Sequence, residues 1–304
     1  RNNNFHSDLL RTYWQNEFQL PSAGSLPLAE VEKYMKIVLS LIVQLRWARI
    51  PVDVEHGEKV NDWILPGGAK VSTSLTEESL EVLKQLRGGF RLIKIGDQYY
   101  LERVPEWTDS RTSFENNINP RMNVSEILLK GNNTILSWGT GAGTDLKEIH
   151  AHYPLNNLVG FSHDFYNDWL SLPKGITIIF DIAENVPKYF KKNSIDLIYS
   201  NLGLIHLSAE VTIPEFIIYL SQLMSLLRLK GEIRIDSDPI KYVERPGIEN
   251  MYDLLLSKVN LKQELVTLNK SNIHYYRISR IVDTDPAKSA ESDKGGIDFG
   301  LATA

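Results

Sequence analysis

The stretch TILSWGTGAGTD, residues 134–145, decides the fold of this chain. A mainly apolar run at 135–138 leads directly into Gly139, Gly141 and Gly143, and a helical pattern of apolar residues follows. A strand, a glycine-rich turn and a helix in this order are the layout by which α/β proteins bind a nucleotide-like cofactor. Glycine permits positive φ and close approach of a ligand to the backbone, and the amide groups at the start of the helix favour an anionic group.

The spacing of the glycines narrows the class of cofactor. A dinucleotide-binding turn has the pattern G-x-G-x-x-G, but Thr144 stands where the third glycine is needed, and the pattern here is G-x-G-x-G. No Lys-Ser/Thr pair follows, which excludes a P-loop. Taken alone, the glycines are also compatible with a tight turn in another kind of α/β protein, so the rest of the chain decides.

Composition excludes several classes of site. The 304 residues contain no cysteine, which rules out disulfides, cysteine nucleophiles and thiolate metal sites. A net charge of −5 argues against a general nucleic-acid binder, which usually carries a basic stripe. The longest apolar run, 37–45, is too short to span a bilayer, and no secretory pattern opens the chain. We therefore expect a cytoplasmic protein that does not enter the membrane.

The first part of the chain, residues 1–115, predicts a mostly helical region that carries a β-hairpin. Thr76 has the chemistry of a helix N-cap, and two alternating runs flank a Gly96-Asp97 turn. The other expectations come from apolar spacing and from the positions of Pro and Gly. They are an amphipathic helix within 1–27, a packing helix at 28–49, a loop-rich segment at 50–74, hairpin strands at 90–95 and 98–104, a linker at 105–123 and a short helix at 122–129.

From residue 134 onward, strand and helix patterns alternate. The predicted strands are 134–138, 157–161, 176–180, 195–200 and 231–236, and the clearest helix between them is 215–228. This alternation indicates a parallel sheet with right-handed crossovers. Two further strands, 262–267 and 274–282, are joined by a short polar segment and predict an antiparallel pair.

At this point the chain resembles the class I S-adenosylmethionine-dependent methyltransferases, whose sheet has five parallel strands and a final antiparallel hairpin. Five pieces in the family's order carry the resemblance, which covers about residues 122–283. They are ILSWGTGAG, LVGFSHD, ITIIFDIAENVP, NSIDLIYSNLGLIHL and LLRLKGEIRI. The implied fold is a Rossmann-like seven-stranded sheet at 116–283, preceded by the region 1–115 and followed by a disordered tail at 284–304.

The resemblance also implies roles for particular residues. The backbone at Gly139, Gly141 and Gly143 would lie against the methionine part and ribose of the cofactor. The Asp181 carboxylate would accept a hydrogen bond from the adenine amino group, with Ile182 against the ring. The cofactor-binding set is completed by Leu202, near the adenine or the sulfonium, and by Ser162 and Asp164.

Two departures from the family pattern put activity in doubt. The family usually has an acid two residues before the first glycine, where this chain has Ser137, and an acid at the end of the second strand, where it has Ser162. A serine offers one hydroxyl in place of two acceptor oxygens and a charge. Asp164 would lie on the same strand face as Ser162 if the strand continues, so it could substitute.

One histidine and two acids follow later strands. His206 comes after the fourth strand and could act as a general base, although a packing or capping role is the alternative. Asp236 and Asp238 follow the fifth strand, but with no third ligand at a suitable spacing we expect no metal site.

The predicted function is methyl transfer from S-adenosylmethionine to a small-molecule acceptor. The alternative is a non-catalytic relative with a binding or assembly role. A nicotinamide-dependent oxidoreductase is disfavoured by the missing third glycine and by the terminal hairpin. Nucleic acid is disfavoured as a partner, and the N-terminal region could form a homodimer.

Overall fold

The computed structural model describes residues 49–86, 88–104, 112–240, 248–267 and 274–281. The chain divides into two compact units, Arg1–Arg49 and Ile50–Ala304, and all the described residues except Arg49 belong to the second. The helix predicted within 1–27 and the tail predicted at 284–304 lie outside the described residues. The helix predicted at 28–49 does so too except for its last residue, Arg49, which is in a strand.

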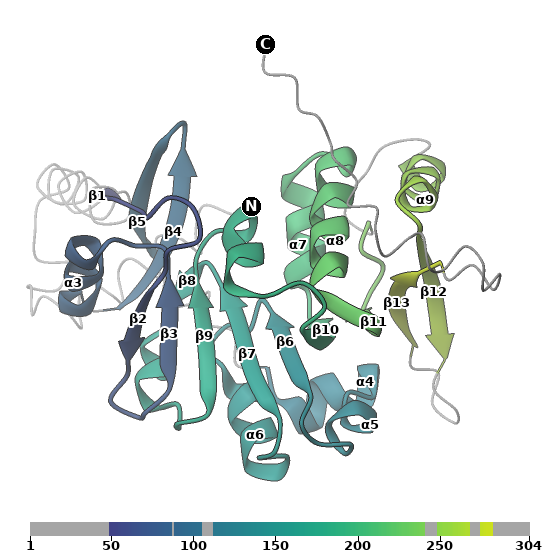
Figure 1. Cartoon of the computed structure of the whole chain (residues 1–304), viewed down its shortest axis with the longest axis horizontal. Coiled ribbons are helices and arrows are strands. Elements are labelled where there is room, and N and C mark those ends of the chain that lie inside the picture. The colour runs from purple at the N-terminus through teal and green to yellow at the C-terminus, as the bar shows by residue number, and fades with distance from the viewer. Residues whose placement is uncertain (1–48, 87, 105–111, 241–247, 268–273, 282–304) are drawn as a thin grey trace, which may run out of the picture. The chain divides into compact units, whose positions relative to one another are not determined.

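A nine-stranded sheet forms the framework of this unit, in the order β12-β13-β11-β10-β6-β7-β9-β3-β2 (Figure 1). Five consecutive members, from β11 to β9, are parallel to one another. They are β6 (Thr134–Trp138), β7 (Asn157–Ser162), β9 (Ile176–Phe180), β10 (Ile195–Ser200) and β11 (Leu227–Ile235). β12 (Leu261–Thr267) and β13 (His274–Arg280) are the expected antiparallel pair, and β13 also pairs antiparallel with β11. The predicted Rossmann-like sheet is confirmed, with two strands more than the seven expected.

The order of the parallel strands places the candidate site. Counted along the chain, they lie in the order third, second, first, fourth, fifth, which is the doubly wound arrangement. The order reverses between β6 and β10, and in such sheets ligands bind outside the carboxyl ends of the strands at this reversal. The predicted glycine turn begins at Gly139, directly after β6 ends at Trp138.

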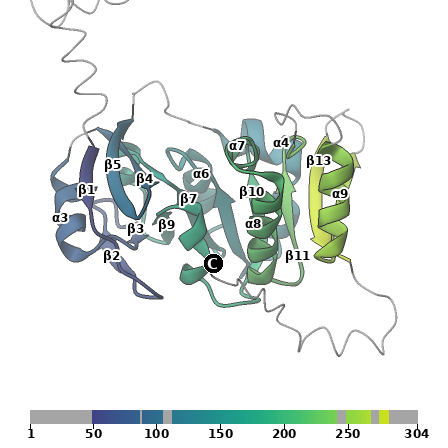
Figure 2. The ribbon, with the colours of Figure 1, turned by 90° about the horizontal axis from the view of Figure 1, so that it is seen from above.

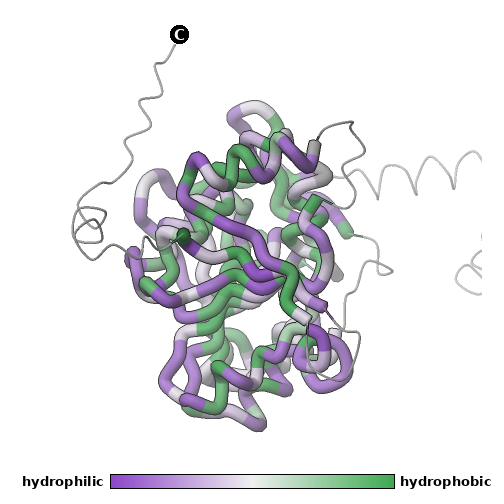
Figure 3. Tube along the Cα trace, turned by 90° about the vertical axis from the view of Figure 1, so that its right-hand side faces the viewer, coloured by the Kyte–Doolittle hydropathy of each residue, from purple (hydrophilic) through white to green (hydrophobic). Residues whose placement is uncertain are grey.

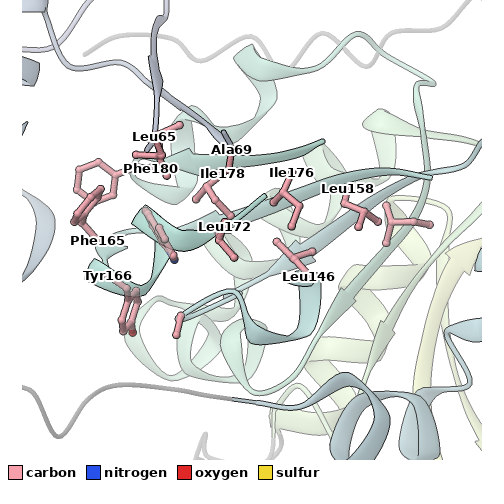
Figure 4. Close-up of a cluster of buried hydrophobic side chains, with 14 of the residues drawn as sticks. Leu65, Ala69, Leu146, Leu158, Phe165, Tyr166, Leu172, Ile176, Ile178 and Phe180 are labelled. Atoms are coloured by element: carbon pink, nitrogen blue, oxygen red, sulfur yellow. The ribbon is translucent and has the colours of Figure 1, made fainter. Parts of the chain in front are cut away.

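Each face of the sheet is covered by its own hydrophobic core. Alternate residues of a strand belong to different cores: Ile135 of β6 is buried in the core that contains Leu146, and Leu136 in the core that contains Phe216. Leu146 belongs to α6 (Thr144–His152) and Phe216 to α8 (Ile213–Leu226), which lie on opposite sides of the strands (Figure 2). Figure 3 shows hydrophobic stretches gathered along the middle of this unit, and Figure 4 shows part of the first core between α6 and the strands.

Local sequence explains where α8 begins. Thr212 and Glu215 form a reciprocal capping box at the start of α8, in which each side chain bonds the other's backbone N–H. The predicted helix at 215–228 therefore begins earlier and ends at Leu226. The remaining helical segments after β6 are η4 (Asn167–Ser171), η5 (Ala183–Tyr189), α7 (Gly203–Glu210) and α9 (Ile248–Lys258).

The prediction that residues 50–74 are loop-rich is wrong at 50–52, 61–64 and 70–73, which are in strands. β2 (Asn61–Ile64) and β3 (Lys70–Thr73) are strands of the main sheet, and β3 pairs in parallel with β9. Each strand has only four residues, and Pro66, Gly67 and Gly68 lie between the two, so the alternation is too short to stand out. Val71 nevertheless is completely buried in the core.

A second, four-stranded sheet has the order β1-β5-β4-β8. β4 (Gly89–Ile95) and β5 (Gln98–Val104) confirm the predicted hairpin, and β1 is Arg49–Val52. β8 (Asp164–Phe165) follows β7 almost directly and pairs with β4, so the hairpin is attached to the end of β7. The helix α3 (Glu77–Gln85) begins as predicted, because the side chain of Thr76 accepts a hydrogen bond from the Ser79 N–H.

The linker predicted at 105–123 is wrong for its described part, residues 112–123. This part forms a single π-helical turn, η3 (Phe114–Ile118), and α4 (Asn119–Met122), and the predicted short helix continues as α5 (Ser125–Leu128). Phe114 and Met122 are completely buried in the core. Asparagines and Pro120 dominate this stretch, and Pro is well tolerated in the first turn of a helix. Among the described residues, no helix has the length and apolar character needed to cross a membrane.

Candidate functional site

The glycine turn connects β6 with α6 at the carboxyl edge of the sheet. Gly139, Gly141 and Gly143 have φ values of 79°, 55° and 76°, a region that side chains other than glycine rarely adopt. The N–H groups of Gly139 and Thr140 both donate to the carbonyl of Phe161, at 2.9 and 3.1 Å. The turn is therefore fixed to the end of β7, and its conformation requires the glycines that the sequence singled out.

A second glycine loop touches the first. A Cβ built on Gly139 would lie 3.0 Å from the Cα of Gly203, which begins α7 after β10. A Cβ on Gly203 would lie 2.7 Å from the carbonyl oxygen of Trp138. The loops after β6 and β10 thus meet backbone to backbone at the reversal of strand order. Gly203 was not singled out from the sequence, because a single glycine after a strand indicates only a turn.

A buried carboxylate lies beneath the glycine turn. Asp145, in the first turn of α6, is 2% exposed. Its Oδ2 accepts hydrogen bonds from the hydroxyls of Ser137 at 2.7 Å and Tyr199 at 2.6 Å. Its Oδ1 accepts one from the hydroxyl of Thr140 at 3.0 Å. One carboxylate therefore ties together β6, the glycine turn, α6 and β10.

Burial raises the pKa of Asp145, and the hydrogen bonds from Tyr199 and Ser137 oppose that rise. The methyltransferases that the sequence resembles usually have an acid at the position of Ser137. Here the Ser137 hydroxyl instead donates a hydrogen bond to Asp145 of α6. Sequence reasoning missed Asp145 because an acid in the first turn of a helix is expected there for its interaction with the helix dipole.

Ser162 and Asp164 lie together after β7 and are engaged with protein groups. Ser162 Oγ accepts a hydrogen bond from the Asp164 N–H at 3.0 Å. The Asp164 carboxylate accepts two hydrogen bonds from Arg91 of β4, from Nε at 2.6 Å and from Nη2 at 3.2 Å. Because β8 pairs with β4, Asp164 leaves the main sheet and joins the second one.

Asp181 lies at the end of β9 and has no exposed surface. Its Oδ1 accepts from the N–H of Ile182 and from the side chain of Asn185, both at 2.8 Å. Its Oδ2 accepts from the N–H of Ser74 at 3.2 Å and from the Tyr189 hydroxyl. All four lone-pair directions of the carboxylate are used by the protein, so contact with an adenine would require these bonds to rearrange.

Leu202 has an unusual conformation at the end of β10. Its φ is 71°, it is 38% exposed although apolar, and its N–H donates to Asp236 Oδ1 at 3.3 Å. A non-glycine residue with positive φ costs conformational energy and is often found at functional sites. His206 lies one turn along α7 with an exposed side chain. Both residues therefore occupy the carboxyl edge, beside the contact between Gly139 and Gly203.

The two acids after β11 have separate partners. Asp236 pairs with Arg121, with Nη1 3.4 Å from Oδ2, and Asp238 accepts a hydrogen bond from the Ile240 N–H at 3.1 Å. Within the described ranges, no group of three or more His, Asp or Glu side chains is arranged to hold a metal ion.

The backbone at this edge suits a nucleotide-like cofactor, but the acidic side chains expected to bind it are already paired with protein groups. The positive-φ turn and the start of α6 suit the close approach of a polar ligand. The acidic side chains expected at the ribose and adenine, Asp164 and Asp181, are occupied by Arg91 and by backbone and side-chain donors.

Comparison with known proteins gives matches in structure alone. No family model matches the sequence, and no curated protein matches it. Similar solved structures include the antibiotic-resistance methyltransferase Kmr, with 12% identity, a TM-score of 0.37, and coverage of 52% of this chain and 92% of that one. Precorrin-6y C5,15-methyltransferase from Geobacter metallireducens has 11% identity, a TM-score of 0.36 and coverage of 58% and 94%. The Methanococcus jannaschii fibrillarin pre-rRNA processing protein has 17% identity, a TM-score of 0.34 and coverage of 63% and 82%.

Proposed function

We propose that this protein transfers a methyl group from S-adenosylmethionine to a small-molecule acceptor. The observation that carries the proposal is the position of the glycine turn. Gly139, Gly141 and Gly143 all have positive φ and lie between β6 and α6 where the strand order reverses. A G-x-G-x-G turn at this point suits a cofactor with a single nucleoside better than a dinucleotide, which needs the third glycine one residue later.

The cofactor would supply an electrophilic methyl on a sulfonium, so the protein's part is mainly alignment. Holding two reactants in line can lower a barrier by as much as about 7–11 kcal/mol. The glycine turn, fixed to Phe161 by two hydrogen bonds, would position one reactant. The exposed His206 on α7 would accept a proton from a hydroxyl acceptor.

Specific observations favour a second candidate, a non-catalytic protein with this fold and a binding or assembly role. Asp181 is fully buried and saturated with hydrogen bonds, and Asp164 is held by Arg91. Ser137 and Ser162 replace the acids that are usual in the family. A cofactor at this edge would consequently lack the charged acceptors that normally hold its ribose and adenine.

Calorimetric titration with S-adenosylmethionine and S-adenosylhomocysteine, with NAD as a comparison, separates the candidates. We expect micromolar binding of both sulfur compounds and none of NAD. Binding should be lost in Gly139→Ala, because its Cβ would press on Gly203 and its φ is 79°. Gly57→Ala is the matched control, since Gly57 has a φ of 75° but no atom within 4 Å of an added Cβ.

Urea unfolding of both variants should accompany the titration, so that a loss of binding is not mistaken for a loss of folding. If neither sulfur compound binds the wild-type protein, the methyltransferase proposal is wrong and the non-catalytic candidate stands. Tight binding of NAD would instead favour an oxidoreductase.

A further inference from the structure

The carboxyl edge holds a polar cluster that the proposed methyl transfer has not used. It consists of the side chains of Arg121 on α4, Asn201 after β10 and Asp236 after β11, and the backbone N–H of Leu202 joins it. Asp236 connects the cluster, because it accepts hydrogen bonds from Arg121 at 3.4 Å and from the Leu202 N–H at 3.3 Å. The cluster adjoins the glycine turn, since Gly203 is in backbone contact with Gly139.

Arg121 has spare hydrogen-bonding capacity at this edge. A guanidinium has five N–H donors. In the described part of the chain, Arg121 donates only through Nη1 to Asp236, at the long distance of 3.4 Å. Its side chain is 50% exposed, whereas that of Asp236 is 1% exposed. The 3.4 Å contact with the buried carboxylate orients the guanidinium, and no other acceptor among the described residues takes its remaining donors.

The backbone that presents Arg121 is held firmly. The side chain of Arg234 on β11 is 5% exposed, and its Nη1 donates to the carbonyls of Met122 and Asn123 at 2.8 and 2.7 Å. Met122 is completely buried. A buried arginine that binds the two carbonyls directly after Arg121 fixes this short helix against the sheet, so Arg121 is a positioned side chain.

The same cluster contains an acceptor without a donor in the described part of the chain. The Oδ1 of Asn201 is buried and has no hydrogen-bond partner among the residues that the structure describes, while its Nδ2 donates to Thr112 Oγ1 at 3.3 Å. Asn201 directly precedes Leu202, whose N–H reaches the same Asp236 that binds Arg121. A buried amide oxygen without a donor is unfavourable, and a ligand N–H or O–H would satisfy it.

We infer that Arg121 and Asn201 form the acceptor subsite, which takes a small molecule carrying both a carboxylate or similar anionic oxygen group and a separate hydroxyl or amine. Arg121 would bind the anionic group by a charge-assisted hydrogen bond, and Asn201 Oδ1 would accept a hydrogen bond from the group that receives the methyl. The role of the bound molecule as methyl acceptor rests on the proposed function. Binding of such a molecule at the subsite does not depend on it.

The test uses 3-hydroxybenzoate and two further probes, each of which lacks one of its two polar features. The probe 3-hydroxybenzoate has a carboxylate and a separate hydroxyl, 3-hydroxybenzamide lacks the charge, and benzoate lacks the hydroxyl. Binding to the full chain is measured by calorimetry, with and without S-adenosylhomocysteine. We expect 3-hydroxybenzoate to bind best, and its affinity to fall about tenfold in Arg121→Gln, since a charge-assisted bond at a half-exposed site is lost. The affinity for 3-hydroxybenzamide should not change in that variant.

Arg228→Gln is the matched control. Arg228 is 52% exposed and pairs with Asp196 at 2.7 Å, but Asp196 lies at the opposite end of β10. Its substitution should leave the affinity for all three probes unchanged. The inference is overturned if wild-type protein shows no saturable binding of 3-hydroxybenzoate, if Arg121→Gln binds it normally, or if Arg228→Gln weakens it equally.

The results distinguish a failure of the proposed subsite from a failure of the proposed methyl transfer. Arg121-dependent binding of 3-hydroxybenzoate without binding of S-adenosylhomocysteine would preserve the subsite and refute methyl transfer. Binding of S-adenosylhomocysteine with no response to the three probes would preserve the proposed function and refute the subsite.

Discussion

Replacing Tyr199 by Phe tests the buried carboxylate network beneath the glycine turn. The change removes one hydroxyl and leaves the packing of the ring in place. That hydroxyl donates to Asp145 Oδ2 at 2.6 Å, and the two residues are 0% and 2% exposed. A hydrogen bond to a charged group contributes about 1.5–3 kcal/mol, so the free energy of unfolding should fall by about 1.5–3 kcal/mol at neutral pH.

The size of this loss should depend on pH. Burial raises the pKa of Asp145, and the Tyr199 hydrogen bond opposes the rise, so Tyr199→Phe moves the pKa still higher. A carboxyl whose pKa is higher in the folded protein contributes stability that is present below its unfolded pKa of about 3.9 and is lost as the pH rises through its folded pKa. The deficit of the variant should therefore be largest where Asp145 is ionised, and should shrink on acidification as the carboxyl becomes protonated.

Urea unfolding followed by circular dichroism, at about pH 8 and about pH 5, measures both effects. Tyr252→Phe is the control, because Tyr252 is 1% exposed and donates to the neutral amide oxygen of Gln263 at 2.8 Å. Its loss should be about 0.5–1.5 kcal/mol. Equal losses in the two variants, or a Tyr199→Phe loss that grows on acidification, would refute the account of Asp145 as a buried charge held by hydroxyls.

Three further substitutions test other parts of the structure by urea unfolding. Gly203→Ala should cost about 1–3 kcal/mol, because its Cβ would lie 2.7 Å from the backbone oxygen of Trp138; an unchanged stability would mean that the two loops are not in contact. Asp181→Ala should cost at least about 3 kcal/mol, since four donors lose their acceptor; a stable variant that only fails to bind S-adenosylhomocysteine would instead support the predicted adenine contact. Thr212→Ala should cost about 1 kcal/mol through loss of the capping box with Glu215, and a neutral effect would count against that cap.

The parallel half of the sheet could be predicted from the sequence because its strands are buried on both faces. β6, β9 and β10 have the predicted bounds to the residue, since their mainly apolar runs end at Gly139, Asp181 and Asn201. β2 and β3 could not be predicted, because four-residue strands show too little alternation and gain their stability from pairing with distant β9.

The glycine turn is the part of the candidate site that the local sequence indicates. The three glycines carry a local signal, since the turn requires positive φ at each. The contact between Tyr199 and Asp145 has no local signal in the sequence. Tyr199 lies 54 residues further along the chain and reaches the carboxylate only because β10 lies beside β6. Arg121 was likewise hidden in a stretch that its asparagines and proline made look like a linker.

The parallel pairing of β3 with β9 has a consequence for how the chain can be divided. A chain that began at residue 116 would keep the glycine turn but lose β2 and β3, leaving the backbone groups of β9 unpaired along an open edge. Asp181 would lose the Ser74 N–H, and Phe165 would lose the Trp63 ring that stacks on it with centroids 5.6 Å apart. An exposed apolar edge of this kind invites pairing with a second molecule and aggregation. We therefore expect that residues 116–283 do not fold stably alone, because β3, which precedes them in the sequence, pairs with the edge of β9.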